Sequence, residues 1–201
     1  MPVPDRHEAM AYEIVAVGSS AGGVKALMAV LGELPTDFRV PLVVVQHLDP
    51  WHDTALAEIL DRRSRLRIKL AEAGDVLEPG VVHLAPPNRH LLVRPGGVLE
   101  LSATDRVKFV RPSVDLLFES VAAVYGPAAL VCVLTGTGSD GSAGAEMVKA
   151  RGGTVVAEDP ETAEFKGMPQ AVVKAVPADL VLPLDEIAGA LVGLVKGTRT
   201  L

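Results

Sequence analysis

The chain alternates short, continuously apolar runs with amphipathic stretches of helix length, and this alternation constrains its fold more than any other feature. The run Pro41–Gln46 is rich in valine, and Ala129–Leu134 is equally apolar. Between such runs, Gly22–Leu34 places apolar residues at helical spacing. Strands that are apolar along their whole length are typical of parallel sheets covered by helices on both faces. The pattern therefore predicts an α/β fold built on a doubly wound, mostly parallel sheet.

The expected elements follow one another with short connections. The predicted strands of the main sheet are Glu13–Val17, Pro41–Gln46, Arg67–Ala71, Val81–Ala85, Ala129–Leu134, Thr154–Ala157 and Asp179–Leu182. The predicted helices are Gly22–Leu34, Asp53–Arg63, Ser113–Tyr125, 141–150, Met168–Val176 and Asp185–Val195. In the middle of the chain, the short runs His90–Val93, Val98–Leu101 and Val107–Val110 predict a small antiparallel hairpin element. We expect residues 1–12 to form a flexible leader and residues 13–201 to form one domain.

Composition excludes several classes of function. The chain has 19 Lys and Arg against 25 Asp and Glu, and this net charge of −6 argues against a nucleic-acid binder. Cys132 is the single cysteine, so an intrachain disulfide is impossible. The apolar runs are far shorter than the roughly 20 residues of a membrane span, and the N-terminus lacks the apolar core of a secretory signal. We therefore expect a cytoplasmic protein that neither binds nucleic acid nor inserts into a membrane.

The first predicted strand runs directly into Gly18–Gly23, whose sequence GSSAGG contains a G-x-S-x-G pattern between a strand and a helix. Small residues around Ser20 permit a sharp turn that lifts its hydroxyl above the edge of the sheet. The N–H groups at the start of the following helix face the same space and can bind an oxyanion. The pattern fits a nucleophilic serine, but it also fits a tight turn or a phosphate cradle.

Two other predicted strands end in residues that can act together with a serine. His47 has the chemistry of a general base and acid, although a plain loop histidine is an alternative. Asp140 can accept an imidazole N–H, or it can cap the helix that begins near Gly141. Because the carboxyl ends of parallel strands gather at one edge of a sheet, we predict that Ser20, His47 and Asp140 form a catalytic triad for acyl transfer.

A Rossmann-like nucleotide-binding or signalling module is the main alternative. The segment Gly136–Gly141 matches G-x-G-x-x-G, and Glu158 and Asp159 follow the next predicted strand as candidate ribose-binding acids. This alternative is disfavoured because Asp140 would put negative charge where a pyrophosphate binds. In addition, the turn after the first predicted strand has Ser20 where a dinucleotide-binding fingerprint has its middle glycine, and a side chain there would crowd the pyrophosphate.

A metal site is a third possibility. His47, Asp49, His52 and Asp53 are close in sequence, but the two histidines straddle an expected junction between a loop and a helix. A second histidine pair at ligand spacing is missing from the sequence. We therefore predict neither a metal nor an organic cofactor.

Several motifs occur in a fixed order along nearly the whole chain, from about Ile14 to Val195. They are Ile14–Gly23 (IVAVGSSAGG), Gln46-His47, Ala85–His90 (APPNRH), Arg111–Phe118 (RPSVDLLF), Leu134–Gly141 (LTGTGSDG) and Gly167-Met168-Pro169. In this order they resemble the catalytic domain of the CheB family, the chemotaxis-receptor protein-glutamate methylesterases.

The resemblance implies a serine hydrolase that removes methyl esters from glutamate side chains in the cytoplasmic domains of methylated chemoreceptors, and that can also deamidate glutamine. It assigns the nucleophile to Ser20, the base to His47 and the partner of the base to Asp140. Well-known members of the family carry a receiver domain before the esterase domain, whereas 12 residues precede Glu13 here. We therefore expect a stand-alone esterase domain over residues 13–201, with control supplied by a separate regulatory protein.

The resemblance also suggests which residues bind the oxyanion and the substrate. These candidates are Ala21, Gly22, Thr137, Arg111, Phe165 and Met168. Many family members have Thr at the position of Ala21 and Met at that of Thr137, so rate and substrate preference can differ. The basic run Arg62–Lys69 either solvates a helix end or docks an acidic receptor helix.

Overall fold

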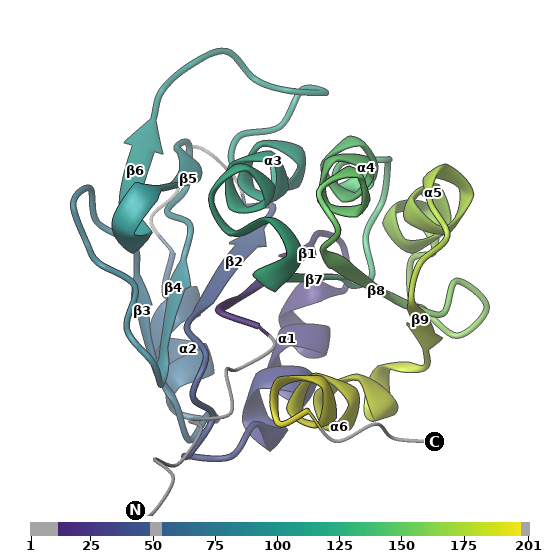
Figure 1. Cartoon of the computed structure of the whole chain (residues 1–201), viewed down its shortest axis with the longest axis horizontal. Coiled ribbons are helices and arrows are strands. Elements are labelled where there is room, and N and C mark those ends of the chain that lie inside the picture. The colour runs from purple at the N-terminus through teal and green to yellow at the C-terminus, as the bar shows by residue number, and fades with distance from the viewer. Residues whose placement is uncertain (1–11, 49–53, 198–201) are drawn as a thin grey trace, which may run out of the picture.

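The computed structural model describes residues 12–48 and 54–197. Its main sheet contains β1 Ile14–Ser19, β2 Leu42–Gln46, β3 Arg67–Leu70, β4 Val81–Leu84, β7 Ala129–Val133, β8 Thr154–Glu158 and β9 Leu180–Leu182. These seven strands pair in parallel in the order β3-β4-β2-β1-β7-β8-β9 (Figure 1). The prediction of a doubly wound parallel sheet is therefore confirmed.

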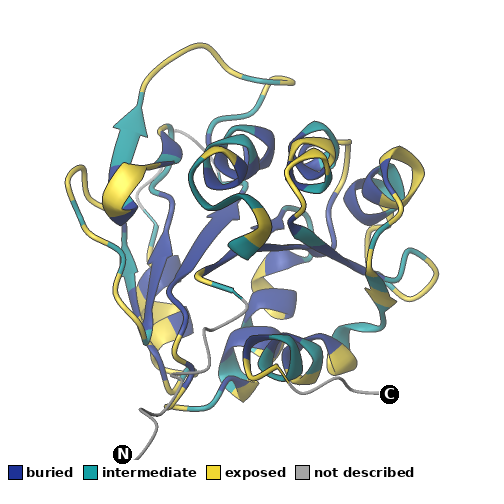
Figure 2. Cartoon of the chain, in the orientation of Figure 1, coloured by how far each residue is buried: buried dark blue, intermediate teal, exposed yellow. Residues whose placement is uncertain are grey.

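Helices cover both faces of this sheet. One face carries α1 Gly23–Glu33, α2 Leu56–Asp61 and α6 Leu184–Val195, and the other carries α3 Val114–Tyr125, α4 Ser142–Ala150 and α5 Gly167–Ala175. Each face has its own apolar core, so successive residues of β2 serve different cores: Val44 packs on the α1 side and Val43 on the α3 side. Burial on both faces is why the strands are apolar along their whole length (Figure 2).

The predicted antiparallel element is present as a hairpin of β5 His90–Arg94 and β6 Val98–Ser102. It packs beside α3, where the backbone N–H of Val93 donates to Ser120 Oγ at 3.0 Å. The prediction of a third short strand at Val107–Val110 is wrong. Only its two end residues pair, in an isolated bridge, because the two residues between them form a tight turn.

The other element boundaries differ from prediction by a few residues. The first strand continues through Ser19, two residues beyond its predicted end. Within this strand, residue 18 is a glycine because the start of α3 packs directly over the end of β1. A Cβ on Gly18 would approach Val114 Cγ1 to 2.3 Å. The helix predicted from Asp53 begins at Leu56, and Asp53 itself lies outside the described residues. Residues 1–11 also lie outside the described residues, so the flexible leader stays a prediction.

The order of the strands fixes where a functional site can form. The chain passes from β1 to β2 on one side of the sheet and later returns to β7 on the other side of β1. In doubly wound sheets, the crevice at such a reversal is the usual place for a site, outside the carboxyl ends of the strands. We call this rim of the sheet the carboxyl edge. Among the described helices, none has the length and apolarity to cross a bilayer.

Candidate active site

Ser20 and His47 lie side by side at the carboxyl edge because β1 and β2 end in register. Ser19 pairs with Gln46, and the backbone N–H of His47 donates to the Ser19 carbonyl at 3.1 Å. On its other side, the backbone N–H of Ser20 donates to the Thr135 carbonyl at 3.0 Å. The nucleophile candidate is thus held between the end of β2 and the turn that follows β7.

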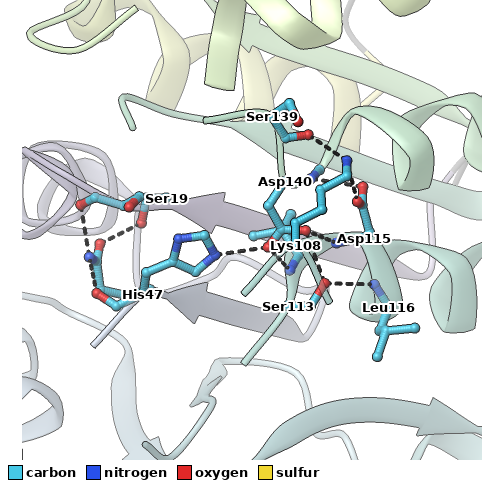
Figure 3. Close-up of polar contacts among 12 residues, drawn as sticks. Ser19, His47, Lys108, Ser113, Asp115, Leu116, Ser139 and Asp140 are labelled. Atoms are coloured by element: carbon cyan, nitrogen blue, oxygen red, sulfur yellow. Dashed lines mark hydrogen bonds and ion pairs between the residues drawn. The ribbon is translucent and has the colours of Figure 1, made fainter. Parts of the chain in front are cut away.

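The imidazole of His47 is hydrogen bonded to the carboxylate of Asp140. His47 Nε2 lies 2.8 Å from Asp140 Oδ2, and both side chains are largely buried (Figure 3). With Asp140 ionised, Nε2 must carry the hydrogen and donate it, which leaves Nδ1 as the basic nitrogen of the ring. Ser20 Oγ makes no hydrogen bond with His47 in this structure, and such contacts commonly shorten only when substrate binds.

Asp140 is held in place by the N-terminus of α3. Its carboxylate accepts hydrogen bonds from the backbone N–H groups of Val114 at 2.7 Å and Asp115 at 3.0 Å, and from Ser113 Oγ at 2.9 Å. Burial alone raises the pKa of Asp140, but the bonds from His47 and from the two backbone groups outweigh burial and bring that pKa below its ordinary value. The carboxylate is therefore charged when His47 needs a partner.

Asp115 makes the reciprocal contact with the next helix. Its Oδ1 accepts the backbone N–H groups of Gly141 at 2.8 Å and Gly144 at 2.9 Å, at the start of α4. Its buried Oδ2 receives no hydrogen bond of good geometry, but it lies 2.8 Å from Lys108 Nζ, so an ion pair compensates its charge. The alternative of Asp140 as the cap of α4 is therefore wrong: Gly141 is the N-cap residue, and the side chain at that helix start is Asp115.

This arrangement also disfavours nucleotide binding at the Gly136–Gly141 turn. A pyrophosphate would need free N–H groups at the start of α4. The N–H groups of Gly141 and Gly144 already donate to Asp115, and the Asp140 carboxylate adds a second negative charge beside them. Glu158, the candidate ribose-binding acid, is buried and accepts the Thr135 N–H at 2.7 Å.

The start of α1 provides N–H groups next to Ser20. Within the described residues, the backbone N–H groups of Ala21 and Gly22 make no hydrogen bond, and α1 begins at Gly23. Gly22 has φ +75°, and a Cβ there would lie 3.2 Å from the Phe165 ring, so the turn accepts only glycine comfortably. Free N–H groups at a helix N-terminus are suited to stabilise an oxyanion.

Met168 lies beneath this turn rather than facing solvent. Its side chain is fully buried, and its backbone N–H donates to the Gly136 carbonyl at 2.9 Å. A Cβ on Gly136 would come within 2.3 Å of Met168 Sδ and 2.8 Å of Ser20 Cβ. The described structure thus gives Met168 a packing contact with the Ser20 turn and no surface to offer a substrate.

Thr135 ties three segments of the site together. Its Oγ1 accepts the Phe165 N–H at 2.8 Å and donates to the Ala21 carbonyl at 3.1 Å, while its own N–H donates to Glu158. Burial raises the pKa of Glu158, and the nearby Glu164 carboxylate raises it further. Sequence reasoning missed Thr135, although a threonine directly after the apolar run Ala129–Leu134 is a signal that could have indicated it.

Arg111 and Thr137 belong to different segments, one before α3 and the other after β7. Arg111 lines a pocket of about 100 Å³ with His47, but its guanidinium donates to Asn88 Oδ1 and to the carbonyls of Ala103 and Thr104. Thr137 is exposed in the turn after β7. Substrate contacts by Arg111, Thr137 and the half-exposed Phe165 remain predictions.

The basic run Arg62–Lys69 lies away from the site. It includes the C-terminal end of α2 and the beginning of β3, and the amino ends of parallel strands form the edge opposite the carboxyl edge. The hypothesis that this run docks an acidic receptor helix stays a prediction, and such a contact would lie at the edge opposite Ser20 and His47. Of the residues weighed for a metal site, Asp49, His52 and Asp53 are not described. Elsewhere in the described ranges, no cluster of three or more His, Cys, Asp or Glu is placed to hold a metal.

Comparisons with known proteins agree with this geometry. The sequence profile of the CheB methylesterase family matches residues 15–191. A Leptospira interrogans protein is 40% identical over 185 residues, which cover 92% of this chain and 96% of that protein. A Moorella thermoacetica protein named protein-glutamate methylesterase/protein-glutamine glutaminase is 44% identical over 189 residues, covering 92% of this chain and 45% of that protein.

A solved structure extends the similarity to the fold. The crystal structure of the Thermotoga maritima CheB methylesterase catalytic domain matches with a TM-score of 0.87 at 41% identity, and the match covers 92% of this chain and 99% of that one. The family profile, the related sequences and the shared fold agree over nearly the same residues. The chain belongs to the CheB methylesterase family.

Proposed function

We propose that this chain is a protein-glutamate methylesterase that uses Ser20 as nucleophile, His47 as general base and Asp140 as the partner of that base. The observation that carries the proposal is the 2.8 Å bond between His47 and Asp140, made beside Ser20 at the carboxyl edge. Family membership supports the reaction type. The proposed substrate is the γ-methyl ester of a glutamate side chain in a chemoreceptor cytoplasmic domain.

Acylation begins with proton transfer from Ser20 Oγ to His47 Nδ1. Because Nε2–H donates to Asp140, the lone pair of the ring is on Nδ1, which lies on the edge of the ring away from Asp140. The Ser20 oxygen attacks the γ-carbonyl carbon and forms a tetrahedral intermediate. The charged Asp140 carboxylate stabilises the imidazolium that results.

The negative charge of the intermediate develops on the former carbonyl oxygen. The N–H groups of Ala21 and Gly22 are the proposed donors to it, since neither has a partner among residues 12–48 and 54–197 and both lie at the positive end of α1. A single donor of this kind contributes about 3 kcal/mol to stabilising the transition state in serine hydrolases.

In the remaining steps His47 acts first as an acid and then again as a base. Protonated His47 gives its Nδ1 proton to the methoxy oxygen as the C–O bond breaks, and methanol leaves. A water molecule then attacks the acyl-enzyme, with its proton passing to His47 and from there to Ser20 Oγ. The products are a free glutamate side chain and regenerated enzyme.

The same steps can deamidate a glutamine side chain, with ammonia as the leaving group. The name of the Moorella relative includes this second activity, which supports it here. An amide carbonyl is a poorer electrophile than an ester, so we expect deamidation to be slower than ester hydrolysis.

The proposed partners follow from the reaction. A chemoreceptor cytoplasmic domain is a protein substrate that would meet the enzyme in the cytoplasm. We also propose that a separate regulatory protein controls access to the site. Binding of a nucleotide is not favoured, because the N–H groups at the start of α4 are already taken by Asp115.

Substitution of the nucleophile tests the proposal. Purified wild type and Ser20→Ala are compared for methanol release from N-acetyl-glutamate γ-methyl ester α-amide. Loss of a nucleophile in a serine hydrolase lowers kcat by about 10⁶-fold, so we expect no measurable turnover. Ser64→Ala is the matched control, because Ser64 lies after α2 near the opposite edge of the sheet. Equal turnover by Ser20→Ala and wild type would refute the assignment.

A further inference from the structure

The segment between β6 and α3 contains a tight turn that its sequence does not favour. Val107 and Val110 exchange two backbone hydrogen bonds, of 3.1 and 2.9 Å, around Lys108 and Phe109. Both central residues have positive φ, +47° for Lys108 and +69° for Phe109. Two-residue turns of this kind normally use Asn, Asp or Gly, and a bulky side chain at positive φ is strained. Strained backbone is found preferentially where a side chain has a function.

Lys108 anchors the turn to the catalytic framework. Its Nζ lies 2.8 Å from the buried Asp115 Oδ2 and donates to the Ser139 carbonyl at 2.9 Å (Figure 3). These contacts direct Lys108 inward and offset the strain of the turn. The residue that follows, Phe109, is then held outward.

Phe109 is exposed to a degree that is unusual for an aromatic side chain. It is 94% exposed, and the segment that carries it extends beyond the body of the molecule in Figure 2. The chain has only four phenylalanines, of which Phe38 and Phe118 are buried in the cores. The fourth, Phe165, is 40% exposed and lies against Gly22 on the Ser20 side of the site.

The turn borders the proposed base. Phe109 and His47 line the same pocket of about 100 Å³, together with Arg106 and Arg111. The guanidinium of Arg111 is engaged within the protein, whereas Arg106 is exposed and pairs with no carboxylate among the described residues. The pocket lining therefore includes one exposed aromatic ring and one exposed guanidinium that forms no ion pair within the part of the chain that the structure describes.

We propose that Arg106 and the turn 107–110, together called the docking turn, bind the polypeptide on either side of the esterified glutamate. Phe109 packs against an apolar residue of the substrate, and Arg106 pairs with an acidic one. The occupant is thus an acidic protein segment with an apolar side chain near the ester, as the positive charge and the exposed ring require. This inference rests on the proposed function, since it concerns how that reaction selects a protein substrate.

The test compares two peptides that carry one glutamate γ-methyl ester each. In the first the ester is flanked by Leu and Asp, and in the second by Gly and Lys. The small ester N-acetyl-glutamate γ-methyl ester α-amide is measured alongside. For wild type we expect kcat/KM to favour the first peptide over the second by about tenfold, a typical effect of one aromatic contact and one ion pair.

Phe109→Asn is the main variant, because Asn tolerates positive φ and lacks the ring. We expect its preference for the first peptide over the second to fall about threefold through KM, because the ion pair of Arg106 remains, with turnover of the small ester unchanged. Its melting temperature should equal or exceed that of wild type, which separates docking from folding. Arg106→Glu should lose the preference for the acidic peptide, and the loss should shrink at high salt. Val181→Asn, at an exposed residue of β9, is the matched control and should behave as wild type.

Each result is decisive. Loss of preference in both variants, with a normal melting temperature for Phe109→Asn, supports the proposal. Wild-type preference retained in Phe109→Asn overturns it, although the esterase activity would stand. If wild type released methanol from none of the three esters, the proposed function would fail, and the docking proposal with it.

Discussion

The carboxylates of Asp140 and Asp115 each bind the N-terminus of the other's helix. Asp140, which precedes α4, accepts N–H groups from the start of α3, and Asp115, in the first turn of α3, accepts N–H groups from the start of α4. The exchange joins two helices over the carboxyl edge and fixes the residue that orients His47. The site is therefore built into the packing of the fold.

Replacing Asp140 by Asn tests its role toward His47. The amide cannot hold the imidazole in the tautomer with hydrogen on Nε2, and it carries no charge to stabilise the imidazolium. We expect kcat for the methyl ester to fall by about 10⁴-fold with little change in KM, as in serine proteases. Steady-state kinetics of methanol release provides the measurement. A decrease of less than tenfold would mean that Asp140 has only a structural role.

Removing Lys108 tests whether it compensates the buried Asp115. Lys108→Met keeps the aliphatic stem but leaves Asp115 Oδ2 without its cation. We expect a loss of about 1–2 kcal/mol in the free energy of unfolding, less than for a fully buried pair because Lys108 is partly exposed. Lys25→Met is the control, since the pair that Lys25 makes with Glu164 is exposed and 3.8 Å long. Urea denaturation that gave equal stabilities for the two variants would argue against the compensation.

A methyl group at Gly136 should disturb Ser20 directly. The Cβ of Gly136→Ala would approach Met168 Sδ to 2.3 Å and Ser20 Cβ to 2.8 Å. We expect a loss of about 1–3 kcal/mol in stability from overpacking, together with a large fall in kcat. Gly189→Ala adds a methyl group in open space on α6 and should raise stability by about 0.5–1 kcal/mol with unchanged kcat. If Gly136→Ala turned over substrate like wild type, the described packing around Ser20 would be incorrect.

Stability should fall as the solution becomes mildly acidic. Burial lowers the pKa of His90, with Arg111 lowering it and Asp140 and the Asp105 carbonyl opposing the shift, and burial likewise lowers the pKa of His83. A histidine with a lower pKa in the folded state binds more protons when unfolded, so stability is lost as pH falls below the unfolded value of about 6.5. The neutral form of His90 is also the one that accepts the Ser113 N–H on Nδ1.

Urea titrations at about pH 7.5 and about pH 5.5, which bracket the unfolded histidine pKa, measure this loss. His90→Gln and His83→Gln should each show a smaller loss between the two conditions than wild type does. Stability that was constant or that rose on acidification would contradict the assignment of neutral, buried imidazoles.

The sequence was sufficient to predict the sheet and to place Ser20, His47 and Asp140 at its carboxyl edge, where His47 and Asp140 are in contact. Apolar strands identify a sheet buried on both faces, and their carboxyl ends then lie at a common edge. The helix predicted over Ser113–Tyr125 is also confirmed as α3, and Ser113 is its N-cap, since its Oγ accepts the Leu116 N–H. These features depend on local sequence and on the order of the elements.

The contacts that support the site could not be predicted, because they join residues far apart in sequence. Asp115 and Lys108 give no local signal of their ion pair. The segment Val107–Val110 resembles a strand by its β-branched residues, and the turn within it depends on the tertiary contacts of Lys108. The basic run after α2 was given a docking role as an alternative, and only the strand topology places it at the opposite edge.

Reaction with a serine-directed fluorophosphonate, followed by mass spectrometry of the digested protein, tests the nucleophile most directly. The account predicts one label per chain, on Ser20, and much slower labelling in His47→Gln because Ser20 then lacks its base. Ser19 is the internal control, since its hydroxyl is buried and donates to Gln46 Oε1 at 2.8 Å. A label on Ser19 or Ser139, or ester hydrolysis that continues at full rate without any label on Ser20, would contradict the account.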